Sequence, residues 1–191
     1  SVSYYEFSNS KETKLYISKF KNDLFDYLIC FRSKFIVQKC ILKNCKISIN
    51  FHPGTPMYRG TGCVNYAIYN DEAYFGSTAH LIDEKIDHGP IINVKKFRLK
   101  KSYKLDDVLK FTWDNMLNQA KDILEKAFYD VNYIQKSIEN YNGDKWSKKI
   151  YTKKNLNNFY RIDLNSNIKN FRKKINATNT KNFKPYIIFH N

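Results

Sequence analysis

Apolar runs and alternating apolar and polar positions predict four β-strands in the first hundred residues. Residues 26–31 form a short apolar run, which indicates a buried strand, and residues 46–52 alternate before the chain turns at Pro53. Two more strands are expected at residues 74–82 and 90–99, separated by a polar loop. With helices between them, these strands predict an α/β fold with a mostly parallel sheet.

Apolar positions at helical spacing predict four helices. Two short helices are expected within residues 33–44 and 62–70, and another around Val131–Tyr141, ending before Gly143. The strongest signal is a long apolar face with a period of 3.6 residues, for which Ser102 is the expected N-cap. The members of this face are Leu105, Val108, Leu109, Trp113, Met116, Leu117, Ala120, Ile123, Leu124, Ala127 and Phe128. Acidic residues in its first turn interact favourably with the helix dipole. The apolar face is typical of core packing and not of a cofactor site.

The last quarter of the chain differs in charge and periodicity. Residues 145–191 contain 12 Lys or Arg against one Asp, a net charge of +11 out of +15 for the whole chain. One amphipathic helix is expected at residues 166–175 and a final strand at residues 185–190. We therefore expect a main domain at residues 1–143 and a short, helical, basic C-terminal segment at residues 144–191.

The composition is that of a globular protein, with 42% hydrophobic and 27% charged residues. Four cysteines, Cys30, Cys40, Cys45 and Cys63, form no CxxC pair, so a reduced, cytoplasmic setting is expected. No stretch approaches the roughly 18 apolar residues of a membrane span, so no membrane partner is expected.

Residues 50–91 gather the residue types that carry chemistry. This window holds three of the four histidines and five of the six glycines. Asn50 and His52 lie two residues apart at the end of a predicted strand, so their side chains point to the same face. Asp87 follows in a Gly-flanked loop between the next two strands. Because ligands of open α/β sheets bind beyond the carboxyl ends of strands, these three residues predict a site.

An amide, an imidazole and a carboxylate suit acyl transfer to an amine. Attack on a carbonyl builds an oxyanion, which the Asn50 N–H and a protonated His52 can stabilise. The amine must lose a proton, which Asp87 can accept directly or through a water molecule. No covalent intermediate is required, and Cys63, the one thiol in this window, has no positioned neighbour in the sequence.

The sequences NFHPGTPMYRG at residues 50–60 and GSTAHLIDEKIDHGPII at residues 76–92 resemble the folate-dependent formyltransferase family. That family includes methionyl-tRNA formyltransferase, glycinamide ribonucleotide transformylase and the sugar-nucleotide N-formyltransferases. Its pattern is Asn-x-His-Pro, a Pro-x-Tyr-Arg-Gly-like loop, and an Asp-x-Gly loop after a Gly-x-Thr strand. The resemblance covers about residues 26–128. It implies a Rossmann-like fold and 10-formyltetrahydrofolate as the formyl donor, with no metal.

The family's catalytic Asn, His and Asp correspond to Asn50, His52 and Asp87. The resemblance also implies that the pterin and formyl end of the folate lie between three segments. These segments are Phe31, Arg32 and Ser33 at a strand end, Pro53, Gly54 and Thr55 after His52, and Asp83, Glu84, Lys85 and Ile86 before Asp87. Arg59 and Gly60 would shape the loop beside the site, where Arg59 either binds a phosphate or braces the loop.

The chain departs from the family pattern at three points. Only 49 residues precede Asn50, so the N-terminal part of the catalytic domain, and part of a pocket with it, is expected to be shortened. Gly54 stands where Ser is commoner. His88 stands where a small residue is usual, so it could crowd or tune Asp87.

The other polar residues of the window have simpler interpretations. His80 lies within a predicted strand and is expected to pack or to hydrogen-bond at the strand end. Asp83 competes with Asp87 as the base, but it lacks the flanking Gly-Pro. A metal site built from these histidines and aspartates is disfavoured because no HxxxH or HExxH spacing is present.

Three acceptors fit a formyltransferase: a nucleotide-linked amino sugar, methionyl-tRNA and glycinamide ribonucleotide. The tRNA enzyme adds a C-terminal β-barrel for which 191 residues leave no room, although the basic segment keeps tRNA as an alternative. The closing sequence IKNFRKKINATNTKNFKPYIIF resembles the segment that replaces the barrel in several sugar N-formyltransferases. A small-molecule acceptor, a nucleotide-linked amino sugar, is therefore expected first, with a homodimer as one candidate assembly. A non-catalytic, formyltransferase-like binding domain is the alternative from another class.

Overall fold

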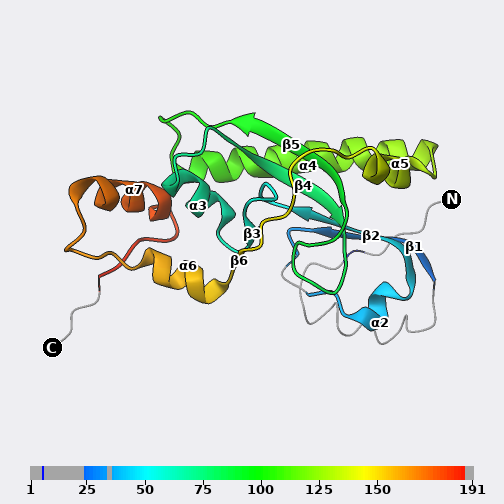
Figure 1. The fold of residues 1–191 in the computed structure, drawn as a ribbon, viewed down its shortest axis with the longest axis horizontal. Coiled ribbons are helices and arrows are strands. Elements are labelled where there is room, and N and C mark those ends of the chain that lie inside the picture. Colours follow the sequence, from blue (N-terminus) through cyan, green and yellow to red (C-terminus); the bar gives the residue numbers. More distant parts are fainter. Residues whose placement is uncertain (1–5, 7–23, 34–35, 188–191) are drawn as a thin grey trace.

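The fold is built on a four-stranded sheet with helices packed against it (Figure 1). The computed structural model describes residues 6, 24–33 and 36–187. The strands are β1 (Phe25–Phe31), β2 (Cys45–His52), β4 (Tyr74–Leu81) and β5 (Ile91–Arg98), in the order β1-β2-β4-β5. Strand β1 pairs parallel with β2, and β4 pairs antiparallel with both β2 and β5. Three of the four strands therefore run in one direction, and the predicted α/β fold is confirmed.

Strand β1 is exposed where the sequence predicted a buried strand. Cys30 is its single buried residue, and the side chains of Ile29 and Phe31 are each 36% exposed. The reason is its position, because among the described residues β1 is hydrogen-bonded only to β2 and lies at the edge of the sheet. A continuous apolar run does not distinguish an edge strand from a central one.

Helices cover the sheet and form its core. They are α2 (Lys39–Leu42), α3 (Cys63–Tyr69), α4 (Leu105–Tyr129) and α5 (Tyr133–Glu139). The core joins the inner faces of the strands to α4 and α5 through Ile49, Phe51, Ala79, Ile92, Met116, Ala120, Ile123, Ala127 and Ile134. The helix expected within residues 33–44 is a single turn, with residues 34 and 35 outside the described part. None of the described helices combines the length and the apolar character needed to cross a bilayer.

The long helix α4 begins two residues later than predicted. Its N-cap is Lys104, whose backbone N–H donates to the Asp107 carboxylate at 2.9 Å. Ser102 lies in a turn closed by the hydrogen bond from Tyr103 N to Lys100 O, so it cannot cap the helix. The apolar face was also predicted too wide, since Phe128 is 71% exposed.

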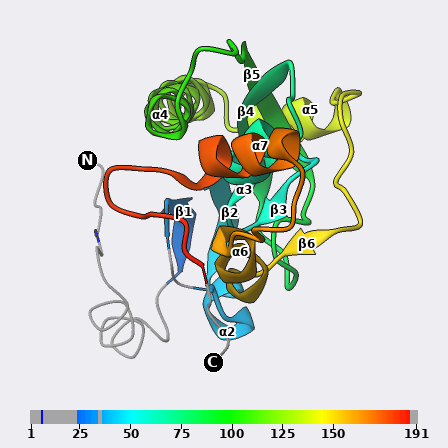
Figure 2. The ribbon, with the colours of Figure 1, turned by 90° about the vertical axis from the view of Figure 1, so that its left-hand side faces the viewer.

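The C-terminal residues return to the main body and pack on α3 (Figure 2). They form β6 (Ile150–Tyr151), α6 (Lys153–Tyr160) and α7 (Ile168–Thr178), and β6 pairs parallel with the short strand β3 (Arg59–Gly60). The Asn65 side chain of α3 donates to the carbonyl of Ala177 in α7 at 2.7 Å. The final strand expected at residues 185–190 is reduced to one bridge between Tyr186 and Arg161, and residues 188–190 lie outside the described part.

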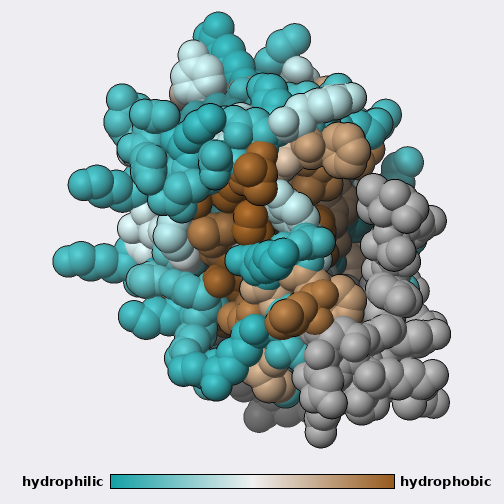
Figure 3. All heavy atoms as spheres, turned by 90° about the vertical axis from the view of Figure 1, so that its right-hand side faces the viewer, coloured by the Kyte–Doolittle hydropathy of each residue, from teal (hydrophilic) through white to brown (hydrophobic). Residues whose placement is uncertain are grey.

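One end of the molecule carries an apolar area (Figure 3). A groove there runs between α2, the start of β2 and α5, and it is lined by Leu42, Ile47, Leu81, Ile82, Val131 and Ile134 among others. None of the predicted site residues lines this groove.

Candidate active site

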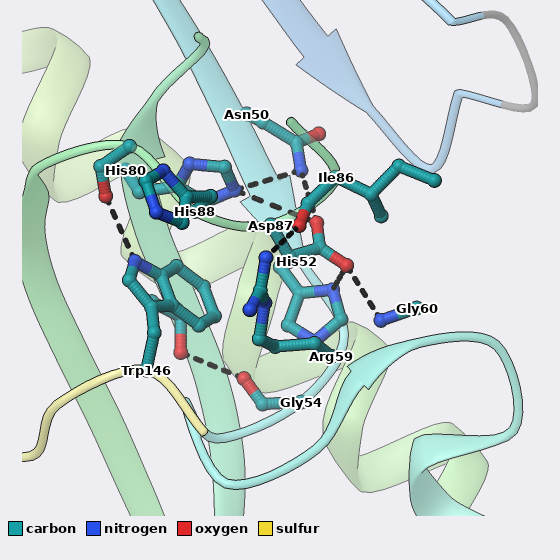
Figure 4. Close-up of polar contacts among 12 residues, drawn as sticks. Asn50, His52, Gly54, Arg59, Gly60, His80, Ile86, Asp87, His88 and Trp146 are labelled. Carbon is teal, nitrogen blue, oxygen red and sulfur yellow. Dashed lines mark hydrogen bonds and ion pairs between the residues drawn. The ribbon is translucent and has the colours of Figure 1, made fainter. Parts of the chain in front are cut away.

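Two neighbouring strands and one loop bring the predicted catalytic residues together (Figure 4). Strands β2 and β4 pair so that Asn50 lies opposite His80 and His52 opposite Thr78. The loop from β4 to β5 returns Asp87 to this edge with a φ of 44°, a left-handed conformation that Asp tolerates better than most residues. The sequence-based expectation that Asp87 approaches Asn50 and His52 therefore agrees with the geometry.

The Asp87 carboxylate lies at the centre of the cluster. Its Oδ2 accepts a hydrogen bond from Gly60 N at 2.7 Å and faces Nδ1 of His52 at 3.2 Å. Its Oδ1 accepts a long hydrogen bond of 3.4 Å from Nδ2 of Asn50 and lies 3.6 Å from Nε2 of His80. Burial opposes ionisation of Asp87, but the nearby His52 and the hydrogen bond from the Gly60 amide hold its pKa below the ordinary value. The carboxylate is therefore ionised and hydrogen-bonded on both oxygens.

The His52 ring is engaged at both nitrogen atoms. Nε2 lies 2.7 Å from the carbonyl oxygen of Tyr58, which can only accept, so Nε2 carries a proton. Nδ1 faces Asp87, and a second proton there would complete a hydrogen bond to the carboxylate. Burial lowers the pKa of His52, and the nearby Asp87 and the Tyr58 carbonyl oppose this shift. Near neutral pH the ring can therefore lose this second proton readily.

His80 belongs to the cluster, which the sequence alone did not predict. Its Nδ1 donates to the carbonyl of Leu81 at 2.7 Å, as expected for a histidine near a strand end. Its Nε2 is then free to accept from Nδ2 of Asn50, at 3.1 Å. Only the β2–β4 register places His80 beside Asn50, and a single strand pattern carries no information on that register.

Two residues brace the loop that carries Asp87. Arg59 is 6% exposed and donates to the carbonyls of Ile86 at 2.7 Å and Ser147 at 2.9 Å. Of the two roles considered for Arg59, the geometry favours bracing. Trp146, which no sequence motif singled out, donates from its indole N–H to the carbonyl of Gly89 at 2.8 Å.

Cys63 lies beside the site but is not activated. Its Sγ is 3.6 Å from Nε2 of His52 and donates to the carbonyl of Tyr58 at 3.2 Å. Burial strongly raises the pKa of this thiol, so it remains protonated and is a poor nucleophile. The absence of a covalent intermediate in the proposed chemistry is consistent with this environment.

The segments predicted to bind folate differ in exposure. Phe31 ends β1 beside the end of β2, and Arg32 and Ser33 follow it. All three are exposed, and the Arg32 guanidinium lies 4.1 Å from the Trp113 ring centroid. Glu84, Lys85 and Ile86 are also exposed. Pro53 is half-buried, whereas Gly54 and Thr55 are buried. A Cβ atom on Gly54 would lie 2.7 Å from Nε2 of His52, so this segment packs beneath the imidazole instead of facing open space.

His88 and Asp83 pair with each other. Nδ1 of His88 lies 2.6 Å from Oδ2 of Asp83, and the Lys85 amide donates to the other Asp83 oxygen at 2.9 Å. His88 therefore tunes Asp83, and among the described residues it forms no hydrogen bond or ion pair with Asp87. Within the same residues, no group of three or more His, Cys, Asp or Glu side chains is arranged to hold a metal ion.

Comparison with known proteins agrees with this geometry. The family model described as Formyl transferase matches residues 7–117. Methionyl-tRNA formyltransferase from Wolbachia pipientis subsp. Culex pipiens (strain wPip) is 32% identical over 91 residues, which cover 47% of this chain and 28% of that protein. The chain spans less than a third of the length of the first curated relatives that it matches.

Solved structures with the same fold include two N-formyltransferases. A sugar N-formyltransferase from Shewanella sp FDAARGOS_354 has a TM-score of 0.71 at 20% identity, covering 95% of this chain and 70% of that one. The N-formyltransferase from Helicobacter canadensis, solved with folinic acid and dTDP-3-aminofucose, has a TM-score of 0.61 at 22% identity, covering 78% and 53%. At such identities these structures establish a shared fold. With the family match over more than half of its residues, this chain belongs to the formyl transferase family.

Proposed function

We propose that this protein transfers a formyl group from 10-formyltetrahydrofolate to a primary amine. The observation that carries the proposal is the position of the Asp87 carboxylate, between the Asn50 amide and the His52 ring at one end of β2. A proton acceptor next to an amide donor is what acyl transfer to an amine requires. Family membership makes the formyl group the acyl group to consider first.

Asp87 takes the proton that the attacking amine loses. The amine nitrogen bonds to the formyl carbon as the carbonyl π bond opens to an oxyanion. The carbonyl then re-forms as the bond from that carbon to N10 of the folate breaks. The amine loses one proton and N10 gains one, so the carboxylate is regenerated at the end of the cycle. The low pKa of Asp87, which its hydrogen-bond partners maintain against burial, keeps it ready to accept a proton at neutral pH.

Asn50 stabilises the oxyanion that develops on the formyl oxygen. Its side chain is half-buried, and its Nδ2 atom contacts His80 at 3.1 Å and Asp87 at 3.4 Å. The longer contact is the weaker one, so in this proposal its N–H is the one that the formyl oxygen can share or take over. A donor of this kind contributes about 3–4 kcal/mol of transition-state stabilisation.

In this arrangement His52 influences the reaction through the basicity of the Asp87 carboxylate. Both of its nitrogen atoms are engaged, by Tyr58 and by Asp87, and its ring is 2% exposed. A protonated ring would stabilise the carboxylate, and a neutral ring would leave it more basic. The sequence suggested that His52 contacts the oxyanion directly, which would require its ring to leave the Tyr58 carbonyl.

For the acceptor we favour a nucleotide-linked amino sugar. The sugar N-formyltransferase from Shewanella shares the fold over 95% of this chain, whose C-terminal residues pack on α3. In this proposal residues 1–143 form the catalytic domain, and the basic residues 144–191 lie where a phosphorylated acceptor approaches. Methionyl-tRNA is the second candidate, because methionyl-tRNA formyltransferases are among the relatives in sequence.

An acceptor screen tests the proposal. The protein is incubated with 10-formyltetrahydrofolate and, separately, dTDP- and UDP-linked amino sugars, methionyl-tRNA or glycinamide ribonucleotide, and released tetrahydrofolate is measured. We expect turnover with an amino sugar nucleotide and no competition by tRNA at physiological salt. Turnover with methionyl-tRNA alone would reverse the choice of acceptor. No turnover with any amine would favour the non-catalytic binding domain.

A further inference from the structure

A segment near the C-terminus lies over the candidate active site. Residues 140–149 connect α5 to β6, and the part of this connection around Ser147 is held from both sides. The Ser147 amide donates to the carbonyl of Pro56 at 2.9 Å, and the Ser147 carbonyl accepts from Arg59 at 2.9 Å. Three residues later β6 pairs with β3, where Gly60, with a φ of 89°, lets the Tyr151 carbonyl approach closely. The position of Trp146 is therefore fixed by its neighbours.

The Trp146 ring packs against both imidazoles of the site (Figure 4). Its centroid lies 5.0 Å from that of His80 and 6.0 Å from that of His52, and both contacts are edge-on. Each histidine is 2% exposed, whereas Trp146 itself is half-buried. The indole is thus the outer layer between these rings and solvent.

The same side chain fixes one end of the Asp87 loop. Its N–H donates to the carbonyl of Gly89, two residues after Asp87, while Arg59 holds the carbonyl of Ile86, one residue before it. Gly89 packs tightly, since a Cβ atom there would lie 2.0 Å from the carbonyl oxygen of Leu81. With both sides of Asp87 held, its carboxylate stays within contact distance of His52 and Asn50.

We propose that Trp146 is a positioning residue for formyl transfer: its ring keeps water away from His52 and His80, and its N–H fixes the loop that carries Asp87. Trp146 touches none of the reacting atoms in this proposal and acts through its neighbours. The kinetic part of the inference depends on the proposed function, whereas the structural part does not.

Two substitutions separate the ring from its N–H group. Trp146→Phe keeps an aromatic cover and removes the hydrogen bond to Gly89, and Trp146→Leu removes both. Phe128→Leu, at a side chain that is 71% exposed on α4, is the control for loss of an aromatic residue. Circular dichroism and thermal unfolding establish that each variant is folded.

Hydrogen exchange tests the structural part without any substrate. We expect the backbone amides of residues 83–89 to exchange faster in Trp146→Phe than in the unmodified protein, because the loop has lost one of its two fixed points. The control should match the unmodified protein. Equal exchange in Trp146→Phe and the unmodified protein would overturn the inference, even if no acceptor is ever found.

Kinetics with the acceptor test the catalytic part. Displacement of a reacting group by about 1 Å can cost on the order of 10²-fold in rate, so kcat should fall by up to about 100-fold in Trp146→Leu. It should fall less in Trp146→Phe, with KM changed less than kcat in both. Unchanged kcat in both variants would refute the positioning role.

The pH profile gives a signature that a purely structural role would not produce. The titratable and charged groups around the covered rings are His52 on β2, His80 on β4, Asp87 on its loop, Arg59 on β3 and Cys63 on α3. Loss of the Trp146 indole exposes His52 to water. Burial lowers the pKa of His52, so on exposure this pKa rises toward its ordinary value. The acid limb of the kcat/KM profile should therefore move to higher pH in Trp146→Leu. An unshifted limb would contradict the shielding role.

Discussion

The Nδ1 atom of His52 lies 3.2 Å from Oδ2 of Asp87, and both side chains are buried. One residue comes from the end of a strand and the other from a loop 35 positions later, yet each is the other's nearest ionisable partner in the site. Because the two groups interact at this distance out of water, a change in either one alters the protonation of the other.

Replacing Asp87 by Asn removes the proposed proton acceptor while keeping the shape of the side chain. We expect kcat for formyl transfer to fall about 10²- to 10⁴-fold, the usual contribution of a general base. The amide oxygen can still accept from Gly60 N, so the unfolding temperature should change little. Release of tetrahydrofolate measures the rate, and Asp122→Asn, at an exposed carboxylate paired with Lys95, is the matched control. Turnover within tenfold of the unmodified protein would exclude Asp87 as the base.

Replacing Asn50 by Ala removes the proposed oxyanion donor. The expected loss in kcat is about 10²- to 10³-fold, with a smaller change in KM, since the hydrogen bond is strongest in the transition state. Asn132→Ala serves as a control, because this exposed side chain makes no capping hydrogen bond at the start of α5. A change confined to KM would instead assign Asn50 to ground-state binding.

The stability of the protein should decrease on mild acidification because of His52. Burial lowers the pKa of this ring below its ordinary value near 6.5, so below that pH the unfolded chain binds a proton that the folded protein does not. The free energy of unfolding then falls with decreasing pH, by at most about 1.4 kcal/mol per pH unit for one proton. Asp87, whose pKa is held low, contributes stability above pH ~3.9 and loses it at lower pH, outside this window.

Urea denaturation at pH 7, 6 and 5 measures this dependence. In His52→Gln the overall stability is lower, but the fall between pH 6.5 and pH 5 should be shallower, because the titrating ring is gone. All other ionisable groups are common to the two proteins. The same slope in both would show that His52 is not responsible.

Replacing Gly89 by Ala should destabilise the fold and displace the Asp87 loop. The added Cβ atom would meet the backbone carbonyl of Leu81 at 2.0 Å, which cannot move without disturbing β4. Overpacking of this kind costs about 1–3 kcal/mol, measurable by thermal or urea unfolding. At Gly143 the nearest atom to a new Cβ is the hydroxyl end of the Tyr141 side chain, at 2.8 Å. Because that side chain can rotate away, Gly143→Ala should have little effect, and equal destabilisation of the two variants would contradict this account.

The elements that the sequence predicts well are those with a local signal. The alternation that stops at Pro53 identifies β2, and the 3.6-residue period identifies α4. The start of α4 was missed because its cap depends on the Asp107 carboxylate and not on the favourable residue type at Ser102.

What the sequence does not predict depends on contacts between distant segments. Strands β3 and β6 have two residues each and no periodicity, and they exist because they pair with each other. His80 and Trp146 join the site for the same reason. The β2–β4 register places His80 beside Asn50, and the segment that leads into β6 brings Trp146 against the His80 ring. The family resemblance predicted Asn50, His52 and Asp87 as site residues, but the contacts between them could be seen only in the folded structure.

The hydrogen bond between Arg59 and Ser147 closes a loop of chain in which the partners are 88 positions apart. Closing so long a loop costs more entropy than forming the neighbouring β4–β5 hairpin, so contacts near in sequence assemble first. We therefore expect the segment around Trp146 to dock late in folding and to exclude water from the two imidazoles after the sheet holds them in place. On heating we expect this segment to undock first, so that enzymatic activity is lost at a lower temperature than the helical signal of the body.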